Sequence, residues 1–282
     1  CIRDRFISLC PSTIRLSEEN ENVAQIREPA VAGMFYPDDP LLLQQQMEGY
    51  LDETESSGEI PKALIVPHAG YVYSGPVAAS GYQLLQGSRR IRRIVMLGPS
   101  HYVRFSGLAL PGVDQLETPL GVLPVDSSAA ALLAESDLVA SSAAAHRREH
   151  SLEVQLPFLQ LVLPNVQLVP LLTGSIDPIA GADVVTPLLD EATLLLISSD
   201  LSHYHDAITA RHLDSETAEA IVQLNPESLG PESACGRTGV QIALHLARRL
   251  GYRGSVLDLR NSADTAGSPD RVVGYGRFAF GG

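Results

Sequence analysis

Four short apolar runs place the strongest limit on how this chain can fold. They lie at residues 63–67 (ALIVP), 93–99 (RIVMLGP), 166–174 (VQLVPLLTG) and 192–199 (ATLLLISS), and helix-like segments alternate with them. A strand is apolar at every position when both of its faces are buried, as in a sheet that helices cover on each side. The sequence therefore predicts an α/β fold, a single αβα three-layer domain with a mixed, mostly parallel central sheet.

The size of the chain fits one such domain. Its 282 residues are 45% hydrophobic, which is enough to bury a large core. We predict that the αβα domain covers residues 27–282. Residues 1–26 carry charges scattered among their apolar residues, so we expect a poorly ordered N-terminal extension rather than a signal peptide.

Composition excludes several classes of protein. The formal net charge is −13, which repels nucleic acid and anionic membranes. The sequence contains no apolar run of 18 or more residues, the length that a membrane-spanning helix needs. Three cysteines are too few for a disulfide scaffold. We expect a cytoplasmic protein with reduced thiols and neither nucleic acid nor membrane as a partner.

Turn and capping signals outline the elements between the runs. Asp38 or Asp39 should cap a first helix that has Pro40 in its first turn. The Pro- and Gly-rich segment 105–126 predicts short strands and a hairpin beside the main sheet. Residues 149–164 fit either a helix or a strand, because Pro157 interrupts their pattern. Further helices are predicted at residues 77–88, 127–139, 213–224 and 235–252, of which the first ends at Gly87 and the last is closed by Gly251.

Polar side chains follow three of the apolar runs. His68 and His101 come just after the first two runs, and Asp200 and His203 come just after the fourth. In an open α/β sheet, loops at the carboxyl ends of the strands converge over a ligand site. One such histidine is most often an ordinary surface or core residue, but the repeated pattern predicts that these four side chains share one pocket.

Cys235 is a further candidate because it precedes a predicted helix. The free N–H groups of a helix N-terminus and the neighbouring Arg237 would lower the pKa of the thiol. Two imidazoles and a thiolate form a credible shell for iron, copper or zinc. A free cysteine is also commonly a small buried hydrophobe, so spacing alone leaves its role open. Glu149 and His150 could cap a helix, or could serve as proton-transfer groups or support for the ligands.

Six segments, in this order, resemble the Memo-like family, whose bacterial and archaeal members are called AmmeMemoRadiSam system protein B. They are REPAVAGMFYP (27–37), PHAGYVYSG (67–75), GPSH (98–101), EHSLEVQLPF (149–158), SSDLSHY (198–204) and CGRTG (235–239). The resemblance spans about residues 27–280 and implies a fold like that of class III extradiol dioxygenases of the LigB type, which hold ferrous iron with two histidines and a carboxylate.

The resemblance also implies a metal site. His68, His101 and Cys235 would ligate iron (Fe²⁺) or copper, with zinc less expected. Asp200 and His203 would be an acid–base pair beside the metal, and Glu149 and His150 would lie nearby. The name of the bacterial members implies a functional link to a radical SAM enzyme and a small companion protein.

Three functions are compatible with these residues. The leading hypothesis is a non-haem metal-dependent oxidoreductase that admits O₂ or a small-molecule substrate to open metal positions, with His203, oriented by Asp200, moving protons. The second is a non-enzymatic metal- or partner-binding module that uses the same pocket. The third is a hydrolase in which zinc activates water and His203 acts as the base.

Overall fold

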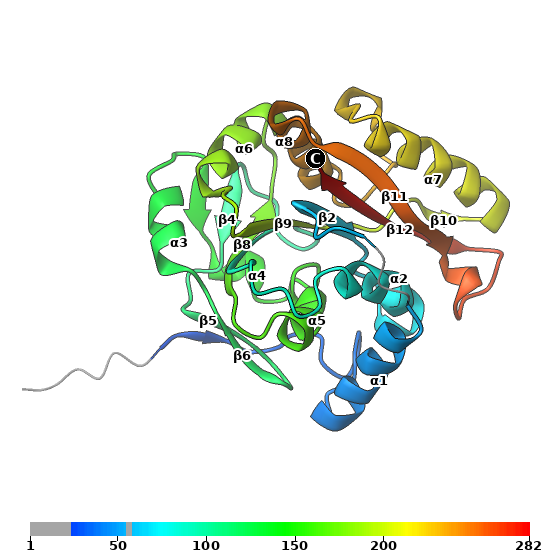
Figure 1. Cartoon of the computed structure of the whole chain (residues 1–282), viewed down its shortest axis with the longest axis horizontal. Coiled ribbons are helices and arrows are strands. Elements are labelled where there is room, and N and C mark those ends of the chain that lie inside the picture. Colours follow the sequence, from blue (N-terminus) through cyan, green and yellow to red (C-terminus); the bar gives the residue numbers. More distant parts are fainter. Residues whose placement is uncertain (1–23, 55–57) are drawn as a thin grey trace, which may run out of the picture.

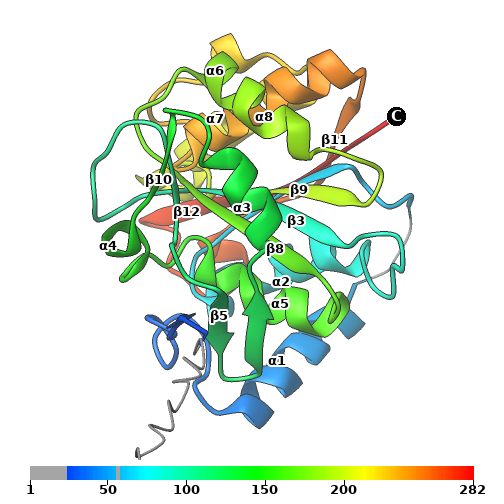
Figure 2. The same ribbon diagram turned by 90° about the vertical axis from the view of Figure 1, so that its left-hand side faces the viewer.

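The computed structural model describes residues 24–54 and 58–282. Most of the expected N-terminal extension, residues 1–23, lies outside this range. Residues 24–26 are described, and Ile26–Arg27 form strand β1. The described chain is built in three layers, with a large sheet between two layers of helices (Figures 1 and 2).

Four parallel strands form the centre of the main sheet. In spatial order they are β2 (Ala63–Val66), β9 (Thr193–Ser198), β3 (Arg93–Pro99) and β8 (Gln167–Thr173). These are the four predicted apolar runs. Because their carboxyl ends lie at one edge of the sheet, the loops that follow β2, β9 and β3 are neighbours.

Antiparallel pairings extend the sheet on both sides. Next to β2 lies β12 (Val272–Gly281), which also pairs with β10 (His203–His205) and β11 (Arg253–Asn261). Next to β8 lies β4 (Leu108–Leu110), which pairs in parallel with β7 (Val139–Ser141). The predicted hairpin is β5 (Gln115–Thr118) and β6 (Gly121–Pro124), which joins β1 in a small separate sheet. The predicted mixed α/β fold is confirmed.

Helices cover both faces of the sheet. On one face lie α1 (Pro40–Asp52), α2 (Tyr71–Gln83) and α5 (Leu156–Val162) (Figure 2). The other face carries α3 (Ser127–Leu133), α6 (Pro178–Val185), α7 (Ala207–Val222) and α8 (Arg237–Leu250). The remaining short elements are α4 (Ala143–His146), η1 (Glu153–Gln155), η2 (Thr186–Leu188), η3 (Pro226–Ser228) and η4 (Ser262–Asp264).

Strand β2 shows why both faces need a helical cover. Leu64 and Val66 pack into the core beneath α1, α2 and α5, whereas Ala63 and Ile65 pack into the core beneath α7 and α8. Successive side chains of a strand point to opposite faces, so an apolar side chain at every position requires two separate cores.

Local signals explain most helix boundaries. Asp39 caps α1 by accepting from the Leu42 N–H at 2.9 Å, and Gly251 ends α8 in a left-handed conformation, both as predicted. The prediction for residues 77–88 placed its helix too late, because α2 starts at Tyr71 and accommodates Pro76 inside the helix. Residues 149–164 contain helix rather than strand, and Pro157 lies in the first turn of α5, where its missing N–H costs nothing.

Among the helices of residues 24–54 and 58–282, none combines the length and the apolar composition that crossing a bilayer requires.

Candidate metal centre

The predicted site residues come from loops at one edge of the main sheet. His68 follows β2, His101 follows β3, and Asp200 follows β9. These three strands are adjacent in the sheet. Cys235 lies just before α8, beside the β9 loop, where its sulfur contacts the backbone of Asp200. The fold therefore brings together side chains that are up to 167 residues apart in the sequence.

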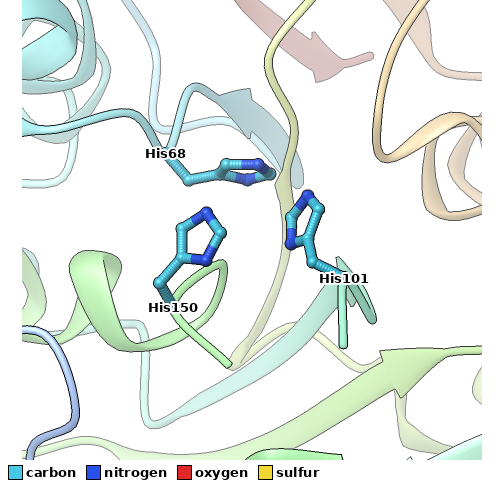
Figure 3. Close-up of side chains that lie close together, drawn as sticks. All are labelled: His68, His101 and His150. Atoms are coloured by element: carbon cyan, nitrogen blue, oxygen red, sulfur yellow. The ribbon is translucent and has the colours of Figure 1, made fainter. Parts of the chain in front are cut away.

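Three histidines lie close together in the centre (Figure 3). The ring centroids of His68 and His101 are 5.3 Å apart, and those of His101 and His150 are 4.6 Å apart. One ring nitrogen from each of the three lies within 4.8 Å of the others, which is close enough to share one metal ion. His150 was expected near the metal as a proton-transfer group, but its position would also let it ligate the metal.

Glu149 holds His101 in place. Its carboxylate accepts from the backbone N–H of His101 at 2.6 Å and lies 2.8 Å from His101 Nδ1. It also accepts from the backbone N–H groups of His150 and Ser151. Burial would raise the pKa of Glu149, but the hydrogen bonds and charge of His101 outweigh it and lower this pKa to about 2. The carboxylate is therefore a fixed acceptor, and it leaves His101 Nε2 free to bind a metal.

Cys235 forms a second group with His68 and Asp200. Its sulfur lies 3.2 Å from His68 Nε2 and accepts from the backbone N–H of Asp200 at 3.2 Å. The ligating atoms of these three residues also lie within 4.8 Å of one another. Within the described parts of the chain, His68 belongs to both groups, and neither group contains His101 together with Cys235.

The expected activation of the thiol by the helix N-terminus is wrong for this structure. Burial, followed by the nearby charge of Asp200, raises the pKa of Cys235 to about 12. These effects outweigh the hydrogen bonds of Asp200, Ser199 and Gly236 to the sulfur, which act to lower this pKa. A metal ion would act in the opposite direction, because coordination deprotonates a thiol. The thiolate therefore depends on a bound cation rather than on the fold alone.

Asp200, which follows β9, and His203, the first residue of β10, do not form the hydrogen bond that was expected between them. Asp200 accepts from the backbone N–H of His68 at 2.7 Å, and burial raises its pKa. His203 Nδ1 lies 2.8 Å from the carbonyl oxygen of Leu201. That carbonyl, rather than Asp200, orients the imidazole and leaves Nε2 of His203 as the proton acceptor.

Burial disfavours the charged form of two of these histidines. It lowers the pKa of His68 to about 3, with His101 as the next cause, and the pKa of His150 to about 4, with His68 as the next cause. Metals bind the neutral imidazole. Buried, neutral imidazoles beside a thiol therefore form a donor set that suits a transition metal such as iron, copper or zinc.

A buried ion pair that supports this centre was not predicted from the sequence. The buried carboxylate of Glu153 pairs with Arg27 at 2.8 Å and accepts from the hydroxyl of Tyr36 at 2.7 Å. Arg27 also donates to the carbonyl oxygens of His146 and Glu149. The N-terminal segment thus fixes the loop that carries Glu149 and His150. The available signal was a charged residue, Glu153, between the apolar Leu152 and Val154.

Comparison with known proteins identifies the family. Residues 27–279 match the family model described as Memo-like protein. The chain belongs to the Memo-like family. It is 36% identical to a MEMO1 family protein of Saccharolobus solfataricus, over 90% of this chain and 99% of the relative.

Two further relatives have a similar sequence identity to this chain. A MEMO1 family protein of Thermotoga sp. (strain RQ2) is 37% identical over 88% of this chain and 97% of its own length. A MEMO1 family protein of Aquifex aeolicus is 34% identical over 89% of this chain and 97% of its own length. The resemblance drawn from the motifs is confirmed.

Proposed function

We propose that this Memo-like protein binds one iron or copper ion through His68, His101 and Cys235 and is a metal-dependent oxidoreductase. The observation that carries the proposal is the position of His68. Its Nε2 lies 3.2 Å from the thiol of Cys235, and one of its ring nitrogens lies within 4.8 Å of a ring nitrogen of both His101 and His150. A bound iron or copper would supply one-electron chemistry toward O₂ or a small-molecule substrate.

The surrounding residues supply orientation and proton transfer in this proposal. Glu149 holds His101 through its Nδ1–H, and His203 presents a free Nε2 that can take a proton from a substrate. Asp200 fixes the backbone of His68 by accepting its N–H at 2.7 Å. His150, buried and neutral, excludes water beside the open metal positions.

Elemental analysis of anaerobically purified protein tests the ligand set. We expect about one iron or copper per chain in the wild type and loss of that metal in both His101→Ala and Cys235→Ala. The matched control is His212→Gln, which removes an exposed imidazole of α7. Metal that both ligand variants retain would contradict the assignment.

His203→Gln then distinguishes an enzyme from a binding module. An enzyme should keep its metal in this variant and lose oxygen uptake with catechols as probes, because the proton acceptor is gone. A module that only stores metal or receives a partner should be unaffected by the same change.

One observation favours a second candidate function. His68, His101 and His150 form a three-histidine group, and three histidines with an open position are a catalytic zinc shell. Zinc would lower the pKa of a bound water, and His203 would accept its proton. If the protein is this hydrolase, His150→Ala should lose zinc and Cys235→Ala should keep it. The proposed oxidoreductase should instead lose its metal in Cys235→Ala and keep it in His150→Ala.

A further inference from the structure

A buried hydrogen-bond network lies behind His68, on the side away from Cys235. It contains Ser198 at the end of β9, Gln155 in η1 and Tyr82 in α2. Each of these three side chains is at most 1% exposed. Ser198 Oγ lies 3.0 Å from His68 Nδ1, so the network contacts the imidazole at the nitrogen that faces away from the metal centre.

The amide of Gln155 can have only one orientation. Its Nε2 lies 2.9 Å from the carbonyl oxygen of Pro67 and 2.7 Å from Ser198 Oγ, and its Oε1 lies 2.7 Å from the Tyr82 hydroxyl. A carbonyl oxygen accepts and never donates, so the amide nitrogen must face Pro67. The second amide hydrogen is then donated to Ser198 Oγ.

The proton of the Ser198 hydroxyl is also fixed. Ser198 Oγ lies 2.5 Å from the carbonyl oxygen of Ser151. Two oxygens this close require a hydrogen between them, and only the hydroxyl can supply it. Ser198 therefore offers only lone pairs to its other neighbours, and His68 Nδ1 must be the donor in the contact between them.

We propose that Ser198 and Gln155 are positioning residues that hold His68 as its Nδ1–H tautomer before any metal binds. The lone pair of Nε2 then points into the metal centre, and no proton has to move within the ring when a metal arrives. Glu149 does the same for His101. Which ring nitrogen binds a metal is set by the hydrogen bond that the other nitrogen makes. This inference rests on the proposed metal site.

Nuclear magnetic resonance tests the tautomer without any metal. Long-range ¹H–¹⁵N correlation spectra of the chelator-treated protein at neutral pH distinguish the two tautomers, and His68→Gln assigns the signals of His68. We expect the Nδ1–H tautomer in the wild type. In Ser198→Ala the acceptor is missing, so His68 should show a substantial Nε2–H population.

The matched control is Ser80→Ala. Ser80 is another buried serine, and its hydroxyl donates to the Val77 carbonyl within α2. This variant should leave the His68 spectrum unchanged. An Nε2–H tautomer in the wild type, or an unchanged tautomer in Ser198→Ala, would overturn the inference. The wild-type spectrum decides the matter even if the variant fails to fold.

Metal titration links the network to binding. Ser198→Ala should weaken iron or copper binding about 10- to 100-fold, the usual effect of losing a group that orients a ligand. Ser198→Thr keeps the hydroxyl and should restore most of the affinity, and Ser80→Ala should match the wild type. Equal affinity in Ser198→Ala and wild type would contradict the role in binding. A wild type without metal affinity would instead refute the proposed function and leave the tautomer result standing.

Discussion

Acid should destabilise the metal-free protein through its buried histidines, and His150 gives a measurable example. Burial lowers the pKa of His150 from 6.5 to about 4 in the folded protein. Between these values the unfolded chain binds a proton that the folded chain does not, so the free energy of unfolding falls as the pH falls. Above pH 6.5 the imidazole is neutral in both states, and it then adds no pH dependence.

The size of the effect follows from the two pKa values. At about pH 5.5, unfolding should take up about 0.9 proton at His150, which corresponds to a slope of about 1.2 kcal/mol per pH unit. The His150 side chain is only 12% exposed, so solvent does not strongly screen the effect. By pH 4 the loss from this one residue should reach about 3 kcal/mol.

Urea unfolding at several pH values, with a chelator present, measures this slope. His150→Gln removes the titrating ring, so its plot of unfolding free energy against pH should be shallower than that of the wild type by about 1.2 kcal/mol per pH unit. His212→Gln, which removes an exposed ring, reports any effect of the substitution itself. Equal slopes in His150→Gln and wild type would show that His150 is already protonated in the folded protein and would refute the reasoning.

Three further substitutions test the supports of the centre. Arg27→Met should lower the free energy of unfolding in urea by about 3–5 kcal/mol, because it leaves the buried Glu153 carboxylate without its cation. A loss below about 1 kcal/mol would contradict a stabilising role of this ion pair. Glu149→Gln should weaken metal binding about 10- to 100-fold in a chelator competition, since it removes the charged acceptor of His101; unchanged affinity would refute this role. Gly236→Ala should lower the free energy of unfolding by about 1–3 kcal/mol, because its new Cβ would lie 2.8 Å from the Ser198 carbonyl oxygen. Gly49→Ala, with open space around it in α1, should not lower the free energy of unfolding. Equal unfolding midpoints for these two variants would contradict the close packing at Gly236.

The sheet was predictable because a strand buried on both faces is a continuous apolar run in the sequence. Runs such as ALIV at β2 and LLLI within β9 have no polar position, and that composition is required wherever helices cover both faces. The predicted helix began at residue 77, directly after Pro76, whereas α2 begins at Tyr71 and contains this proline, which normally breaks a helix. Tertiary packing of Tyr71 and Tyr82 outweighs that local signal.

The candidate site was predictable only in part. Strand-end position indicated His68, His101 and Asp200, since parallel strands deliver such residues to one edge. The orientation of each imidazole depends on atoms that no local pattern shows, among them the Leu201 carbonyl beside His203 and the Ser198 hydroxyl beside His68. The protonated thiol of Cys235 was missed for a similar reason, because its burial beside Asp200 arises only when β9 and α8 pack together.

Metal-edge X-ray absorption of the purified, metal-loaded protein tests the ligand assignment most directly. A shell of His68, His101 and Cys235 predicts one sulfur at about 2.3 Å and two imidazole nitrogens at about 2.0–2.1 Å around iron or copper, by analogy with the bond lengths of zinc sites. The sulfur contribution should vanish in Cys235→Ala. A shell of nitrogen alone in the wild type, unchanged in Cys235→Ala and lost in His150→Ala, would contradict the thiolate site and place the metal among the three histidines.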